Sequence, residues 1–156
     1  MTRDELITLA RATAQKHSLD PTLVCAVAHH ESNDWNPWAT RFEPGFLKRY
    51  IEPMGEDVPR FGTTISKDTE RRDRATSFGL MQVMGQVARE YGFRGEYLSE
   101  LLTPELALEY GCQRLARALR AAGFAVRPAL LRYNGGSDPK YPDLVLAHID
   151  AYTVNP

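Results

Sequence analysis

Apolar residues recur at helical spacing at the start of the chain and again in its last third. Thr2 and Glu5 have the spacing of a capping box, which predicts a helix that begins there and closes near residue 17. Asp20 and Pro21 have the residue types of an N-cap and a first helical position. A second helix is therefore expected to begin at Pro21 and to carry an apolar stripe.

The last third of the chain predicts three further helices. Thr103 and Pro104 are typical of a helix start, and Gly123 is typical of a helix stop. A shorter helix is expected from about Pro128 to Tyr133, and a last one near Pro142–Tyr152. The apolar face of the longest of these helices comprises Leu108, Cys112, Leu115, Ala116 and Leu119.

Between these parts the periodicity breaks. A short helical segment is expected at 46–51, an irregular stretch at 53–65 and a charged, solvated helical turn at 66–74. Apolar periodicity returns at 78–88, and no strand longer than a few residues is visible. The pattern predicts one mainly α domain over residues 1–156, with a long irregular insert after the second helix.

Composition narrows the class of protein. With 43% hydrophobic and 25% charged residues, the 156-residue chain resembles an ordinary soluble globular domain. Its net charge of −1 gives no overall field that would attract nucleic acid or an anionic membrane. The sequence has no run of 18 apolar residues, so stable membrane insertion is not expected. The first residues lack the features of a signal peptide, so synthesis in the cytoplasm is expected. Cys25 and Cys112 fall in helical patterns and are interpreted as buried thiols.

One polar residue interrupts the stripe of the second helix. Val24, Val27 and Ala28 share a face, and Glu31 is its next member. Burial and the negative end of the helix dipole both disfavour an ionised carboxylate, so they favour the protonated form that a general acid needs. The alternative is a glutamate that marks the helix end and turns toward solvent.

Two later stretches also carry unusual residues. Gly79 stands between large apolar residues, which suits a close approach to the backbone, and Gln82 offers both a donor and an acceptor. A buried helix start with an incidental glutamine is the alternative. Tyr133 and Asn134 precede two glycines; a helix C-cap explains the glycines but does not require the tyrosine.

Taken in order, three motifs resemble the lytic transglycosylase (SLT domain) and goose-type lysozyme superfamily. They are Glu31–Ser32, Gly79–Gln82 and Tyr133–Gly136, and the resemblance extends from the first helix to about residue 150. The stretches 41–44 and 74–77 are most similar to phage endolysin-like members. The resemblance implies a lysozyme-like α-helical domain in which the irregular insert lines a saccharide cleft.

By this resemblance the substrate is the β-1,4 bond between N-acetylmuramic acid (MurNAc) and N-acetylglucosamine (GlcNAc) in peptidoglycan glycan strands. Glu31 would protonate the glycosidic oxygen and then act as base on the muramoyl 6-hydroxyl, which yields a 1,6-anhydro product without a metal or other cofactor. We expect a monomer that reaches the cell wall after holin-type release or through a secretion apparatus. The residues implied to bind substrate are Ser32, Ser77, Gly79, Met81, Gln82, Tyr133 and Asn134.

A hydrolysing lysozyme is the alternative chemistry. An inverting hydrolase needs a second carboxylate with room for a water molecule. Asp73 stands five residues before Phe78, where goose-type lysozymes carry a carboxylate, but their further aspartate is replaced here by Met84. Glu43 and Glu70 are other candidates, although both are more typical of surface charges. Transglycosylation is therefore preferred.

Some residues of the chain also allow other interpretations. His29, His30 and Glu31 lack the spacing of a His-Glu-x-x-His motif, so no metal site is expected. Trp35 and Trp38 suit either stacking on sugar rings or packing under a loop. A non-catalytic peptidoglycan-binding protein or a structural virion protein is the alternative of another class, and the presence of Glu31 argues against it.

Overall fold

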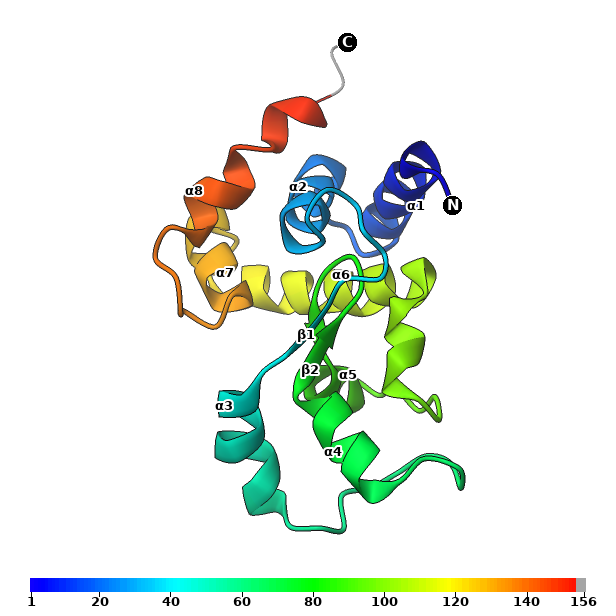
Figure 1. The fold of residues 1–156 in the computed structure, drawn as a ribbon. Coiled ribbons are helices and arrows are strands. Elements are labelled where there is room, and N and C mark those ends of the chain that lie inside the picture. Colours follow the sequence, from blue (N-terminus) through cyan, green and yellow to red (C-terminus); the bar gives the residue numbers. More distant parts are fainter. Residues whose placement is uncertain (154–156) are drawn as a thin grey trace.

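Helices dominate the computed structural model, which describes residues 1–153 (Figure 1). The longest helix, α6 (Pro104–Ala121), crosses the middle of the molecule and packs against α1 (Arg3–Lys16) and α7 (Val126–Tyr133). Helix α2 (Pro21–Glu31) packs along α1. This arrangement confirms the mainly α class expected from the sequence.

Two of the predicted helix starts are confirmed by capping contacts. The Thr2 hydroxyl accepts from the backbone N–H of Glu5, and the Glu5 carboxylate accepts from that of Thr2. At the next helix, the Asp20 carboxylate accepts from the N–H of Thr22 at 2.8 Å, and Pro21 occupies the first turn. This cap fixes the start of α2. The helix continues for 11 residues, so Glu31 is its last residue.

The C-terminal segment closes over α2. Helix α8 (Tyr141–Leu146) and the 3₁₀ turn η4 (Ile149–Ala151) both contact it. The hydroxyl of Tyr152 accepts from Trp35 Nε1 at 2.6 Å and lies 2.7 Å from His29 Nδ1. The helix predicted near Pro142–Tyr152 is shorter in the structure. It ends at Leu146, and the chain then forms the 3₁₀ turn η4.

The insert between α2 and α6 contains a small antiparallel sheet in the order β1–β2–β3. Arg41 pairs with Ser77, and Ser77 pairs in turn with Met84. Short helices surround the sheet (Figure 1). The elements of the insert are β1 (Thr40–Phe42), α3 (Pro44–Phe46), the π-helical η1 (Leu47–Ile51), η2 (Glu52–Met54), α4 (Lys67–Arg74), β2 (Thr76–Phe78), β3 (Val83–Met84), α5 (Gly85–Glu90) and η3 (Leu98–Leu102).

The core lies where α2, α6 and the turn between β2 and β3 meet. Leu80 and Met81 are fully buried there, against a helix whose Gly111 leaves room for the methionine. Cys25 and Cys112 are buried and unbridged, as expected, and burial raises their thiol pKa values to about 11 and about 12.

The structure corrects one prediction for the insert. The 66–74 stretch is helical and largely exposed, as expected, but Glu70 is not a surface charge, because its carboxylate is fully buried between Arg74 and Arg89. The buried helix start considered as an alternative at Gly79–Gln82 is absent, because residues 78–88 form the end of β2, a turn, β3 and the start of α5. The periodicity of a short apolar run does not distinguish a buried helix from a buried strand.

Candidate active site

Glu31 is the last residue of α2, and its side chain is partly buried. The hydroxyl of Tyr141, the first residue of α8, donates a hydrogen bond to Glu31 Oε1. The two residues are 110 positions apart in the chain. The carboxyl group is thus held between the end of one helix and the start of another.

A polar cleft of about 160 Å³ opens at Glu31. Six of the predicted site residues line it together: Glu31, Glu43, Ser77, Gln82, Tyr133 and Asn134. The residues that sequence reasoning missed are Arg41, Met84, Arg114 and Ser137, together with Tyr141 behind Glu31. Residues of α2, the three-stranded sheet, α6, α7 and α8 therefore converge around one carboxyl group.

The electrostatics of the cleft favour the protonated form of Glu31. Burial is the largest influence and raises the pKa of this carboxyl above its usual range. The hydrogen bond from Tyr141 and the charges of Arg114 and Arg41 act in the opposite direction but are smaller. A protonated carboxyl facing a polar cleft suits a general acid near neutral pH.

The turn between β2 and β3 positions Gln82. Its backbone is left-handed, with φ of 45°, and its Nε2 donates to the carbonyls of Ala39 and Gly79 at 2.9 and 3.0 Å. The N–H of Gly79 also donates to the Ala39 carbonyl, at 2.8 Å. Because both amide hydrogens are engaged within the fold, the Gln82 amide oxygen is the group left to contact a ligand.

The glycine of this turn is required by packing within the protein. Gly79 has φ of +70°, and a Cβ there would lie 2.5 Å from the carbonyl oxygen of Leu101. The close approach expected at this position is therefore made by the protein's own backbone, and Gly79 does not line the cleft.

Three other predicted residues also lie outside the cleft lining. Ser32 is fully buried and donates to the Ala28 carbonyl at 2.6 Å. Met81 is fully buried, and its carbonyl accepts from the Tyr133 hydroxyl at 2.7 Å. Asp73, at the end of α4, has its pKa raised to about 6 by burial and by the nearby charge of Glu70. Of the three candidate second carboxylates, Asp73, Glu43 and Glu70, only Glu43 lines the cleft.

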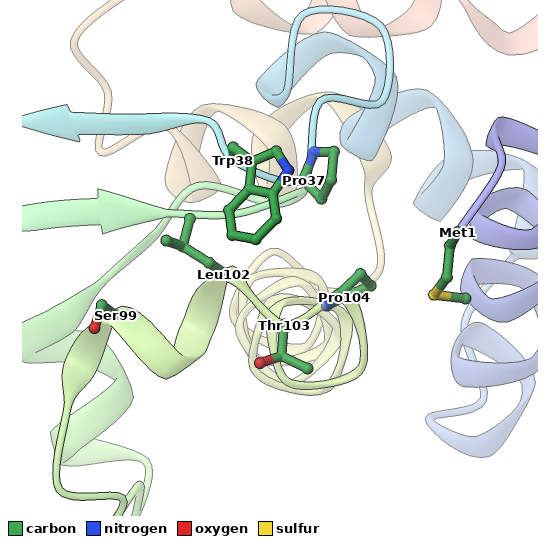
Figure 2. A pocket seen from close by; sticks show the side chains of 7 residues that line it. All are labelled: Met1, Pro37, Trp38, Ser99, Leu102, Thr103 and Pro104. Atoms are coloured by element: carbon green, nitrogen blue, oxygen red, sulfur yellow. The ribbon is translucent and has the colours of Figure 1, made fainter.

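A larger hollow, of about 580 Å³, lies on another part of the surface (Figure 2). Figure 2 shows the Trp38 indole beside Pro37 and Leu102, with Met1 across the hollow. No acidic side chain lines it, so it cannot supply the proton that Glu31 can. Trp38 is 72% exposed, whereas Trp35 is buried against the ring of Tyr152 and donates to its hydroxyl.

Behind Glu31, histidines pack against one another. The rings of His29 and His148 stack with centroids 3.9 Å apart, and burial lowers the pKa values of His29 and His30. Within residues 1–153, no three His, Cys, Asp or Glu side chains gather in a way that could hold a metal ion. No helix among these residues has the length and apolar character needed to cross a bilayer.

The family description "Transglycosylase SLT domain" matches residues 8–142, which include Glu31, every residue of the cleft and Tyr141. The chain belongs to the transglycosylase SLT family. This SLT domain is therefore an enzyme of the lytic transglycosylase or glycosidase type that acts on the peptidoglycan of the cell wall. Searches among curated proteins and among solved structures find no match to it.

Proposed function

We propose that this SLT domain cleaves the β-1,4 bond between MurNAc and GlcNAc, with Glu31 as both acid and base. Protonated Glu31 donates its proton to the glycosidic oxygen as the bond from muramoyl C1 to that oxygen breaks. The resulting Glu31 carboxylate then accepts the proton of the muramoyl 6-hydroxyl, while the oxygen of that hydroxyl bonds to C1. Glu31 is thereby protonated again, and the product is a 1,6-anhydro sugar formed without water.

One observation carries the proposal. The carboxyl group of Glu31, which has a raised pKa and accepts a hydrogen bond from Tyr141, faces a polar cleft. Gln82, Asn134, Ser77 and Tyr133 line the same cleft and would contact the saccharide. Met81 would act by packing, since its carbonyl holds the Tyr133 hydroxyl. In this proposal Ser32 and Gly79 support the shape of the cleft and do not contact the sugar.

Hydrolysis is the second candidate chemistry, and the position of Glu43 favours it. This carboxylate lines the cleft and pairs with Arg41 Nε at 2.7 Å. It could activate a water molecule on the face of the sugar opposite Glu31. Asp73 would have to reach the cleft from outside its lining, which makes Glu43 the stronger choice for a second carboxylate.

Clearing of outer-membrane-stripped Gram-negative cells tests the catalytic assignment. Glu31→Gln should lower the clearing rate by about 10²–10⁴-fold, the usual contribution of a general acid–base residue. Glu56→Gln, in an exposed loop, is the matched control and should clear as fast as the wild type. Equal clearing by wild type and Glu31→Gln would refute the role of Glu31, and no clearing by either would favour a peptidoglycan-binding protein.

Mass spectrometry of the released muropeptides distinguishes the two chemistries. Transglycosylation predicts 1,6-anhydro ends, which contain one water less than the reducing ends left by hydrolysis. Reducing ends whose formation is lost in Glu43→Gln would establish the lysozyme mechanism instead.

We also propose a phage-type lysis role, in which the domain is made in the cytoplasm and reaches the wall through a holin-type lesion. The resemblance of residues 41–44 and 74–77 to endolysin-like members supports it. Expression in a bacterial host should cause lysis only when a membrane lesion is induced. Lysis without that lesion would instead favour a secretion- or tail-associated role.

A further inference from the structure

Two arginines line the cleft, and they differ in their partners. Arg41 forms an ion pair with Glu43, whose carboxylate lies 2.7 Å from Arg41 Nε. Arg114, which projects from α6, forms no ion pair with any carboxylate among residues 1–153. Because Glu43 pairs with Arg41 and burial shifts Glu31 toward its neutral form, Arg114 is the charged group of the cleft without an ion-pair partner among residues 1–153.

The guanidinium of Arg114 is held in place from two sides. One nitrogen donates to the carbonyl of Tyr133, and the guanidinium carbon lies 4.8 Å from the centroid of the Tyr133 ring. That ring is itself buried and bonded to the Met81 carbonyl. A guanidinium carries five N–H donors, so most of them remain available in a fixed orientation beside the cleft.

We propose that Arg114 binds a carboxylate of the substrate glycopeptide next to Glu31, which makes it a specificity-determining residue. A planar, preorganised guanidinium suits bidentate binding of a carboxylate. The inference rests on the proposed function, because peptidoglycan carries carboxylates from two sources. One is the lactyl group of muramic acid in strands without peptide, and the other is the peptide stem.

Binding of this carboxylate would also act on the catalytic group. The positive charge of Arg114 is one of the influences that lower the pKa of Glu31. A substrate carboxylate paired with Arg114 neutralises that charge, so Glu31 becomes more strongly protonated when substrate is bound. Substrate binding therefore prepares the acid for the first step.

The test compares strands that differ only in their carboxylates. Peptide-free glycan strands and peptide-bearing strands are each used as prepared and after conversion of their carboxylates to amides. Wild type should show a kcat/KM on the order of tenfold to a hundredfold higher for the carboxylate form of at least one strand, as expected for charge-assisted hydrogen bonds. A preference seen with peptide-free strands identifies the lactyl carboxylate, and one confined to peptide-bearing strands identifies the stem.

Three variants locate this preference at Arg114. Arg114→Gln should abolish it, and Arg114→Lys should retain part of it because a lysine keeps the charge but not the fork of donors. Arg117→Gln is the matched control, since Arg117 is exposed on the same helix and stacks on Tyr91 at 4.3 Å. The control should keep the full preference. The inference would be overturned if Arg114→Gln slowed cleavage of the carboxylate and amidated strands equally. It would also be overturned if the wild type showed no preference for the carboxylate strands.

A binding measurement separates this inference from the proposed reaction. Calorimetric titration of Glu31→Gln with carboxylate and amidated strands should show tighter binding of the carboxylate form, and Glu31→Gln/Arg114→Gln should bind both alike. If wild type cleaves no strand but this difference in binding persists, the reaction is refuted and the carboxylate site stands. If wild type cleaves strands but the affinities do not differ, the carboxylate site is refuted alone.

Discussion

The buried carboxylate of Glu70 offers the sharpest test of how the insert is held together. Its Oε1 lies 2.9 Å from both Arg74 Nε and Arg89 Nε, and its Oε2 lies 2.9 Å from Arg89 Nη2. The remaining guanidinium donors bind neighbouring groups, including the Pro59 carbonyl at 2.7 Å and the Gly95 carbonyl at 2.7 Å. One anion thus joins α4 to α5 and to the loops around them.

Glu70→Gln keeps the shape of this side chain but removes its charge. Two buried guanidinium groups would then lack a counter-ion, and loss of one partner of a buried pair costs about 3–5 kcal/mol. The total free energy of unfolding of a domain of this size is about 5–15 kcal/mol. The expected fall in melting temperature is about 6–20 °C, at about 2–4 °C for each kcal/mol.

Urea and thermal unfolding followed by far-UV circular dichroism measure this loss. Asp57→Asn is the matched control, because Asp57 pairs with Lys67 of the same α4 helix but is 86% exposed. The control should leave the midpoint unchanged. A melting temperature of Glu70→Gln within about 2 °C of wild type would show that the buried charges are not mutually dependent, contrary to the reasoning above.

Three further outcomes follow from the site. Tyr141→Phe removes a hydrogen bond that lowers the pKa of Glu31, so the alkaline limb of the kcat/KM–pH profile should move to higher pH while the maximum falls about tenfold. Because burial raises the Glu31 pKa, the folded state holds its proton more tightly than the unfolded chain and stability falls as pH rises above about 4.5. Glu31→Gln should therefore unfold at a higher urea concentration than wild type at pH 7, with the difference shrinking in acid. Gly79→Ala should lower the free energy of unfolding by about 2–5 kcal/mol in urea titration, since its Cβ would meet the Leu101 carbonyl at a left-handed φ.

Local signals predicted the parts of the fold that depend on neighbours in the chain. The caps of Thr2 and Asp20 and the apolar stripe ending in Glu31 involve contacts over a few residues, so the sequence shows them directly. The burial of Glu70 cannot be recognised from the sequence, because a charged helix has the same composition whether its charges are solvated or buried. Its second partner, Arg89, lies 19 residues away and is not marked by any local pattern.

Only part of the cleft can be predicted from the sequence, because local patterns do not show which distant residues meet. The motif residues Gln82 and Tyr133 could be named, but nothing local distinguishes Gln82, which faces the cleft, from Met81, which faces the core. Arg114 belongs to a helix whose periodicity shows only which side is apolar. Tyr141 has no sequence signal as a partner of Glu31, because their hydrogen bond exists only once α2 and α8 have packed.

The long separation between Glu31 and Tyr141 has a consequence for synthesis. The residues of α1 and α2 are synthesised first, but the group that holds the Glu31 carboxyl arrives 110 residues later. Tyr152, which binds Trp35 just after α2, arrives 117 residues after its partner. The acid is therefore in place long before its cleft exists, and a ribosome-bound or truncated fragment that ends before α8 carries the glutamate without the environment that makes it a catalyst.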